Sequence, residues 1–183
     1  MLDLARNHFD LLGLPVAYEV DPDRLAERYH DLQRRLHPDR FAAAGERERR
    51  LSLQASTRIN EAYQTLRDPL RRAQYLLGLL AGGDGAAAGT SADAAFLMEQ
   101  MELREALAGA RERPDPLAEV DAVIDRLAAQ AAALTRALGE RFAGAGREDL
   151  KAAEELVRKL QFVTKCRAEA ERLAAELDGS EAG

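Results

Sequence analysis

The sequence predicts an all-α protein, and three observations lead to this fold class. Ala, Leu, Glu and Arg, which are good helix formers, dominate the 183 residues. Val and Ile are too sparse for an extensive sheet. Apolar residues recur at spacings of three and four over long segments, which is the pattern of one helix face. With 46% hydrophobic residues the chain can build a core, although only 5% of its residues are aromatic.

Four helices are expected in the first 80 residues, over about 7–14, 21–36, 46–67 and 70–80. Asn7 is a suitable N-cap for the first helix, and Gly13 ends it. Asp21 and the proline after it begin the second helix, since Asp favours the N-cap and Pro the first helical position. Pro38 ends that helix because proline lacks a backbone donor and disfavours helical geometry at the preceding residue. The dipeptide that begins with Asp68 and continues with proline ends the third helix.

The second and third helices each carry one apolar face. The spacing of the apolar residues is three or four in both helices, so each set lies on one side. The expected faces are Leu25, Tyr29, Leu32 and Leu36 in the second helix, and Leu51, Ala55, Ile59, Ala62 and Leu66 in the third.

The rest of the chain predicts a separate helical bundle. The segment 81–90 holds four of the 13 glycines and is typical of a linker. Three further helices are expected, over about 92–109, 115–142 and 147–177, and short breaks between them favour an antiparallel three-helix bundle. We therefore divide the chain into an N-terminal domain (1–80), a linker (81–91) and a C-terminal bundle (92–183).

Composition excludes several classes of protein. The single cysteine, Cys166, rules out an internal disulfide framework and fits a reducing compartment. There is no signal-peptide pattern, and no apolar stretch approaches the roughly 18 residues of a membrane span. Residues 1–80 carry 13 basic and 12 acidic side chains, whereas residues 81–183 carry 13 and 20. We expect a cytoplasmic protein with two modules for different partners, neither of them a membrane or a nucleic acid.

The turn between the second and third helices carries the most informative residues, His37-Pro38-Asp39-Arg40. Polar residues on a loop that a rigid scaffold presents serve contact more often than packing. The helix before them is basic and holds Arg24, Arg28, Arg34 and Arg35. One alternative is that Asp39 only ends the helix and the arginines only solvate it.

Catalysis is a second alternative for this turn, with His37 and Asp39 as a general acid and base. No nucleophile or second polar cluster in the sequence accompanies them. No Cys, His, Asp and Glu grouping has metal-ligand spacing either. We therefore expect neither an enzyme nor a cofactor or metal site.

The flanks of the turn resemble the J-domain family of co-chaperones over roughly residues 5–76. The resemblance is carried by Tyr29-His30-Asp31-Leu32-Gln33-Arg34-Arg35-Leu36 before the turn, and by Arg40-Phe41 and the stretch from Ile59 to Pro69 after it. It implies two long antiparallel helices joined by a His-Pro-Asp loop that docks on a DnaK-type chaperone and stimulates its ATPase. It maps the essential tripeptide onto His37, Pro38 and Asp39, and Arg40 stands where lysine is commonest. Its basic helix corresponds to Arg24, Arg28, Arg34 and Arg35, which can steer towards an acidic surface.

The first bundle helix has two apolar faces. Phe96, Leu103 and Leu107 fall together at about 100° per residue. A second face, rotated away from the first, holds Leu97, Met98, Met101 and Glu105. One stripe suffices to dock a helix in a bundle, and a methionine patch rimmed by charge suits partner binding. The alternative is a central helix that is buried on most sides.

In the last helix we expect Leu156, Leu160, Val163, the stem of Arg167, Ala170 and Ala174 to face inwards. Phe162 lies roughly 120° from the centre of this stripe. It is either an interface anchor or a residue that packs against the second of the two helices that neighbour this one in the bundle.

A J-domain followed by a linker and a bundle that opens Phe96-Leu97-Met98-Glu99-Gln100 is similar to the HscB-type co-chaperones of iron–sulfur cluster assembly. The similarity spans nearly the whole chain, including Arg158-Lys159-Leu160-Gln161-Phe162. It implies an L-shaped protein, the chaperone HscA and the scaffold IscU as partners, and no cofactor. The implied scaffold-binding residues are Leu97, Met98, Met101, Glu102, Glu105 and Phe162. Met101 stands where leucine is usual, and Gly109 where an acidic residue can contribute. The alternative is a J-domain co-chaperone for another client, with a bundle used for dimerisation.

Overall fold

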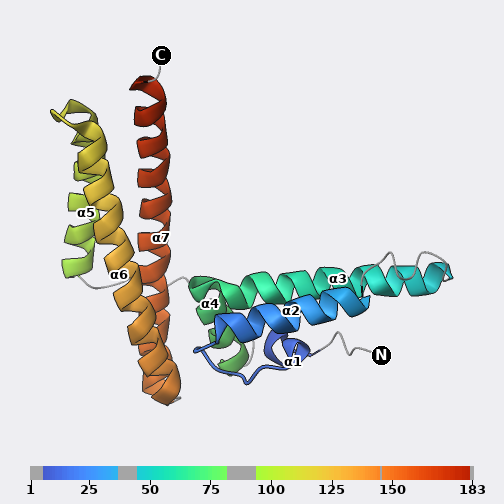
Figure 1. Ribbon diagram of the computed structural model, residues 1–183. Helices are drawn as coiled ribbons and strands as arrows, with labels where there is room; N and C mark the ends of the chain where they lie inside the picture. The colour runs from blue at the N-terminus through green and yellow to red at the C-terminus, as the bar shows by residue number, and fades with distance from the viewer. Residues whose placement is uncertain (1–5, 37–44, 82–93, 145, 182–183) are drawn as a thin grey trace. The chain divides into compact units, whose positions relative to one another are not determined.

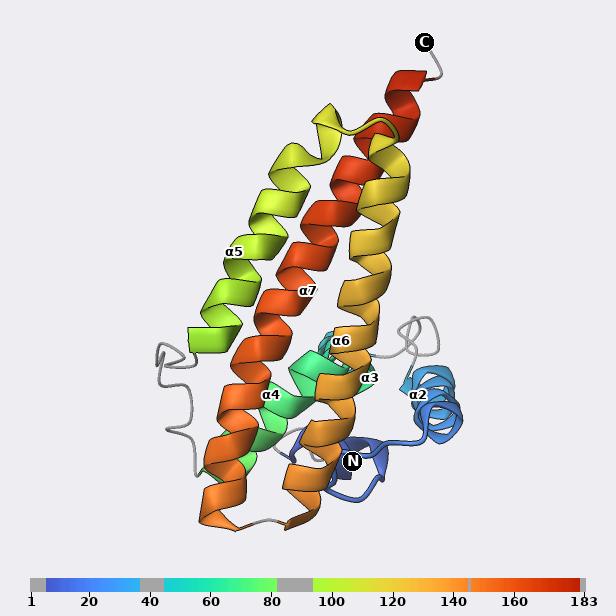
Figure 2. The same cartoon turned by 90° about the vertical axis from the view of Figure 1, so that its left-hand side faces the viewer.

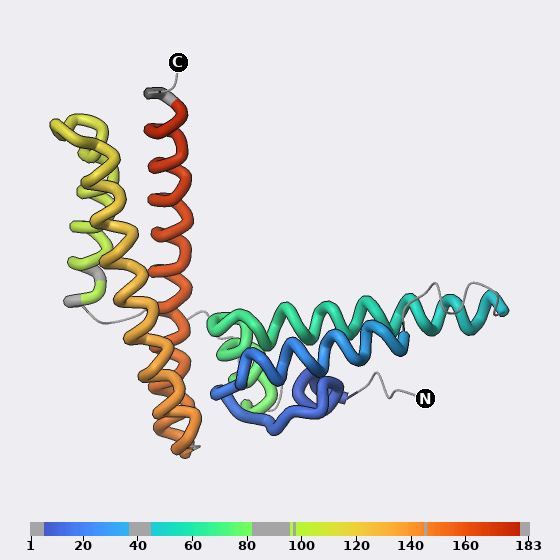
Figure 3. Tube along the Cα trace, in the orientation of Figure 1, coloured from blue at the N-terminus to red at the C-terminus, as the bar shows by residue number. Residues whose placement is uncertain are grey.

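All regular secondary structure in the described part of the chain is helical. The computed structural model describes residues 6–36, 45–81, 94–144 and 146–181, and no strand occurs within these ranges (Figure 1). The all-α prediction is confirmed. The chain forms two compact units, Met1–Gly85 and Ala86–Gly183, and the trace in Figure 3 can be followed through each of them.

The N-terminal unit contains four helices. They are α1 (His8–Leu12), α2 (Pro22–Leu36), α3 (Glu46–Arg67) and α4 (Pro69–Leu80). The caps are the ones that the sequence predicts: the Asn7 side chain accepts a hydrogen bond from the Asp10 N–H at 2.9 Å, and Gly13 ends α1 with a φ of 65°. Asp68 caps α4 by accepting from the Arg71 N–H at 2.8 Å. Local side-chain chemistry therefore sets these helix ends.

The core of this unit lies where α1, α2, α3 and α4 meet. Helices α2 and α3 run antiparallel, and α1 packs against both of them (Figure 1). Phe9, Leu12, Leu25, Ile59 and Leu66 are among its fully buried side chains. The predicted face of α3 is correct from Ala55 to Leu66 but wrong for Leu51, which is 38% exposed. Leu51 lies beyond the end of α2, because the neighbouring Ser52 already contacts the last residue of that helix.

Arg72 is a buried cation that ties three segments together. Its Nη1 donates to the Leu66 carbonyl oxygen at 2.6 Å, and its guanidinium carbon lies 5.0 Å from the centroid of the Tyr18 ring. The Leu66 carbonyl belongs to the last turn of α3, where carbonyls have no partner within the helix. Tyr18 in turn donates to the Pro69 carbonyl oxygen at 3.3 Å.

Arg72→Met is expected to lower the free energy of unfolding of this unit by about 2–3 kcal/mol. Methionine keeps a long apolar stem but leaves a buried carbonyl without its charged donor and removes the cation–π contact. Urea denaturation followed by circular dichroism measures the change. Arg71→Met, at the exposed neighbouring position, should change stability by less than about 0.5 kcal/mol. Equal stability of the two variants would contradict the role of Arg72.

The C-terminal unit is a bundle of three helices and a short connector. They are α5 (Ala94–Gly109), the 3₁₀ turn η2 (Ala110–Glu112), α6 (Pro116–Gly144) and α7 (Arg147–Glu181). Figure 2 shows α5, α6 and α7 side by side, with α5 shorter than the other two. Asp115 caps α6 by accepting from the Ala118 N–H at 3.0 Å, with Pro116 at the first helical position.

The core of the bundle joins one face of each helix. Its buried residues are Leu103, Ala110, Val120, Val123, Leu127, Val163, Cys166 and Ala170. The expected stripe of α7 is correct at Leu160, Val163 and Ala170 but wrong at Arg167, which is exposed and donates to Glu171 at 2.9 Å. Cys166 takes the inward position, 2% exposed, because a small apolar residue fits there without burying a charge.

Candidate functional site

Helix α2 ends directly before the His37-Pro38-Asp39-Arg40 motif. The four residues themselves lie outside the described part of the chain. Before the motif α2 ends at Leu36, and after it α3 begins at Glu46. The Ser52 hydroxyl donates to the Leu36 carbonyl oxygen at 2.8 Å, so the end of α2 is attached to α3 one residue before the motif.

The predicted basic helix is α2, and its four arginines are all exposed. Arg24, Arg28 and Arg35 lie within about 40° of one another around the helix axis. Asp31 interrupts this face and pairs with Arg35 at 3.0 Å and with Arg34 at 3.9 Å. Asp23 and Glu27 also lie among the arginines, so α2 carries four basic and three acidic side chains. Its solvated arginines extend to the end of the helix next to the motif, where they can contribute to electrostatic steering.

Helix α5 has one buried face and one exposed face. Phe96 and Leu103 are 6% and 3% exposed, whereas Met98 and Met101 are 64% and 69% exposed. Glu102 and Glu105 are exposed and share the side of the methionines, at spacings i, i+3, i+4 and i+7 from Met98. We call these four residues the outer face of α5. The alternative of a helix buried on most sides is wrong, because large apolar side chains on this face meet solvent.

Leu97 and Phe162 complete the residue set that the sequence points to. The backbone of Leu97 lies in α5, and its side chain is outside the described part of the structure. Phe162 is half-buried in α7 and packs on α5: its ring meets that of Phe96 edge to face, with centroids 5.5 Å apart. The Arg104 guanidinium carbon lies 5.7 Å from the centroid of the Phe162 ring. Phe162 therefore lies at the junction of α5 and α7.

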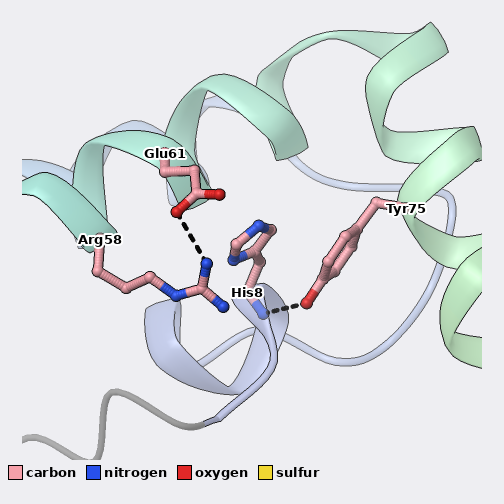
Figure 4. Close-up of polar contacts among 4 residues, drawn as sticks. All are labelled: His8, Arg58, Glu61 and Tyr75. Atoms are coloured by element: carbon pink, nitrogen blue, oxygen red, sulfur yellow. Dashed lines mark hydrogen bonds and ion pairs between the residues drawn. The ribbon is translucent and has the colours of Figure 1, made fainter. Parts of the chain in front are cut away.

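A polar cluster that was not expected from the sequence lies at the junction of α1, α3 and α4 (Figure 4). His8 is 3% exposed, its ring stacks on Tyr75 with centroids 4.1 Å apart, and its backbone N–H donates to the Tyr75 hydroxyl at 2.9 Å. Arg58 donates to Glu61 at 2.8 Å beside it. No sequence signal pointed to this cluster, because its residues are distant along the chain. The ring stacking and the buried position make it a packing element that holds α1.

The pKa of His8 lies below its ordinary value of 6.5, first because burial disfavours the imidazolium and second because the Arg58 guanidinium repels it. Below pH 6.5 the His8 side chain therefore binds a proton more readily in the unfolded chain than in the folded chain. The stability linked to His8 is present above pH 6.5 and is lost as the pH falls below it towards the folded-state pKa. Urea denaturation over a pH series should show this loss, and His8→Phe, which keeps the stacking, should reduce it.

Two absences hold for the described ranges. Within them, no three His, Cys, Asp or Glu side chains come together as ligands for a metal ion. None of the helices described here combines the length and apolarity that crossing a membrane requires.

Comparisons with known proteins agree with the division into two units. The DnaJ domain model matches residues 7–75, and the model of the HSCB C-terminal oligomerisation domain matches residues 92–171. A co-chaperone protein HscB homolog from Shewanella sp. strain ANA-3 is 41% identical over 167 residues, which cover 91% of this chain and 96% of the relative. The chain belongs to the HscB co-chaperone family.

Solved structures of HscB proteins have the same fold. Chaperone HscB from Vibrio cholerae is 40% identical with a TM-score of 0.81, and the match covers 94% of this chain and 99% of that one. The human co-chaperone protein HscB is 29% identical with a TM-score of 0.78, with 92% and 82% covered. The curated HscB relatives are co-chaperones, and the family carries a J-domain, whose partner is a chaperone of the DnaK type. The predicted HscB-type J-domain co-chaperone is thereby confirmed.

Proposed function

We propose that this HscB family member is a two-ended adaptor in the cytoplasm that delivers an iron–sulfur scaffold of the IscU type to the chaperone HscA. The bundle binds the scaffold through the outer face of α5, with Leu97 and Phe162 at its margins. The J-domain stimulates ATP hydrolysis by HscA through His37, Pro38 and Asp39, so that nucleotide hydrolysis is coupled to scaffold capture in iron–sulfur protein maturation.

The exposure of Met98 and Met101 carries the proposal for the bundle. Two large apolar side chains on neighbouring turns are about two-thirds exposed on a helix that already has a buried face for packing. A flexible thioether side chain can adapt to the surface of a partner, and its burial there removes apolar area from water. Glu102 and Glu105 flank the methionines and favour a partner with basic groups around an apolar patch.

The charge of α2 supports the proposal for the J-domain. Arg24, Arg28 and Arg35 lie on one solvated side of the helix that leads into the motif. Such a surface raises the association rate with an acidic partner, and the rate falls as salt screens the charges. We therefore expect the stimulation of HscA at limiting concentrations of this protein to fall as ionic strength rises.

The experiment that tests the proposal uses the full chain with purified IscU and HscA. Titration calorimetry measures binding to IscU, and single-turnover ATP hydrolysis by HscA is measured with the chain alone, IscU alone and both together. We expect the two together to stimulate more than the sum of their separate effects, because the adaptor brings the scaffold to the chaperone. Stimulation by the two together that only equals the sum of their separate effects would contradict the proposal, and so would a lack of binding to IscU.

A second candidate is self-association through the bundle, which the description of the matching family model as an oligomerisation domain favours. In a symmetric dimer built on the outer face of α5, the carboxylates of Glu102 and Glu105 would face those of the other copy, which costs free energy. Sedimentation velocity over a range of concentrations decides this point. A dimer that persists at the concentrations that saturate IscU would favour the second candidate.

A further inference from the structure

The contact between α2 and α3 changes character along its length. Near α1 it is apolar, with Leu25 and Leu66 fully buried, and Ala55 and Ile59 continue the buried apolar face farther along α3. Towards the end of α2, hydrogen bonds between side chains cross from one helix to the other. Leu32 and Leu36 in this half are only half-buried, and Ser52 is the buried residue opposite the end of α2.

Four hydrogen bonds make up this polar half. The Tyr29 hydroxyl donates to Asn60 Oδ1 at 2.9 Å, and Gln33 Nε2 donates to the same oxygen at 2.5 Å. The Ser56 hydroxyl donates to Gln33 Oε1 at 3.2 Å. Ser52 donates to the Leu36 carbonyl oxygen. Six residues take part in these bonds, Leu36 through its backbone carbonyl and the others through their side chains: Tyr29, Gln33, Leu36, Ser52, Ser56 and Asn60.

Hydrogen bonds specify register in a way that apolar contacts do not. If the register of α2 on α3 shifts by one residue, each side chain moves about 1.5 Å along the helix axis and rotates about 100° around it. Aliphatic side chains can repack after such a shift, whereas a hydrogen bond weakens steeply outside its narrow range of distance and angle. Gln33 uses both ends of its amide, as donor to Asn60 and acceptor from Ser56, so it fixes the rotation of α2 on α3.

We propose that Gln33 and Ser52 are positioning residues for stimulation of the chaperone ATPase. Ser52 holds the last carbonyl of α2, which directly precedes His37, and Gln33 fixes the rotation of the helix that presents Arg28 and Arg35. Neither residue needs to touch the chaperone. The inference rests on the proposed function, because it explains how α2, which carries the arginines and ends one residue before the motif, keeps one rotation and register on α3.

The test measures HscA ATPase stimulation as a function of the concentration of the full chain. Ser52→Ala removes one hydrogen bond and is expected to lower maximal stimulation roughly fivefold. This factor corresponds to the usual net free energy of one hydrogen bond. The concentration for half-maximal stimulation should change less, because the arginines of α2 remain. Gln33→Leu removes two hydrogen bonds at similar volume and is expected to lower maximal stimulation and raise the half-maximal concentration. Ser52→Thr, which keeps the hydroxyl, should retain most of the stimulation.

Thr57→Val is the matched control. The Thr57 hydroxyl donates to the Leu53 carbonyl oxygen within α3 at 3.0 Å, so its loss removes a hydroxyl of the same helix without breaking a contact to α2. It should stimulate as the unaltered chain does. Circular dichroism and IscU binding report the folded fraction of each variant, and Ser52→Ala decides the question if Gln33→Leu does not fold.

The outcomes separate the two hypotheses. No stimulation by the unaltered chain means that the proposed function is wrong. Full stimulation by the unaltered chain and by Ser52→Ala alike overturns the positioning role while the proposed function stands. A loss in Thr57→Val equal to that in Ser52→Ala also overturns it, because the effect would then come from α3 alone.

Discussion

Replacing Met98 and Met101 together by alanine is expected to weaken binding to IscU by about 2–4 kcal/mol, roughly 30- to 1,000-fold in Kd. The two thioether side chains are 64% and 69% exposed, so they contribute little to the fold of the bundle and much of their area is available to a partner. Titration calorimetry measures the change in affinity. Helical content and the thermal midpoint should stay close to those of the unaltered chain, because neither side chain belongs to the core.

Two control variants define what this loss means. Leu53→Ala removes a similarly exposed apolar side chain, 59% exposed, from the N-terminal unit and should leave IscU affinity unchanged. Leu103→Ala, on the buried face of α5, should destabilise the bundle by about 2–5 kcal/mol. Unchanged affinity after the double substitution would show that the outer face of α5 is not the scaffold site. Phe162→Ala is a poorer probe, because it also removes the contact with Phe96 that holds α5 on α7.

His37→Gln is the substitution with the second largest expected effect, and it should abolish stimulation of HscA while leaving IscU affinity intact. Glutamine keeps a polar side chain of similar size but removes the imidazole from the motif that the family resemblance identifies as essential. The bundle that carries the outer face of α5 is a separate compact unit, so binding to the scaffold should persist. Single-turnover ATP hydrolysis by HscA, with and without IscU, measures the first effect and calorimetry the second.

His30→Gln makes the same chemical change seven positions earlier, on the exposed surface of α2. It should stimulate HscA as the unaltered chain does, so a loss confined to His37 assigns the effect to the motif and not to the loss of a histidine. Retained stimulation in His37→Gln would show that the J-domain acts on the chaperone by another route. A loss of IscU binding in the same variant would contradict the independence of the two ends.

Local sequence signals predicted the helix ends and the two faces of α5. Asn7 and Asp21 cap the helices predicted for them because their side chains reach backbone donors two or three residues away, which depends only on neighbouring residues. Asp68, which was expected only to end the third helix, also caps α4. The separation of Phe96 and Leu103 from Met98 and Met101 follows from the rotation of 100° per residue alone. The resemblance to the J-domain and HscB families was likewise readable in short stretches of sequence.

Contacts between distant segments were beyond such reasoning. The choice between Arg167 and Cys166 as the inward residue of α7 is a rotation of one residue, and packing against α5 and α6 decides it. The edge-to-face contact of Phe162 with Phe96 and the stacking of His8 on Tyr75 join residues that the sequence does not pair. Each of these contacts depends on the relative rotation of two helices, which apolar periodicity leaves open within tens of degrees.

The amino-acid sequence was sufficient for the helix pattern, the charge of α2 and the motif that ends it, because all three depend on residues within one or two helical turns. Only the tertiary structure decided that Met98 and Met101 stay exposed beside a packed core, and that Ser52 and Gln33 hold the end of α2 on α3. The physical reason is that burial and hydrogen bonding between helices are settled by how whole helices pack, where a shift of one residue exchanges buried and exposed side chains.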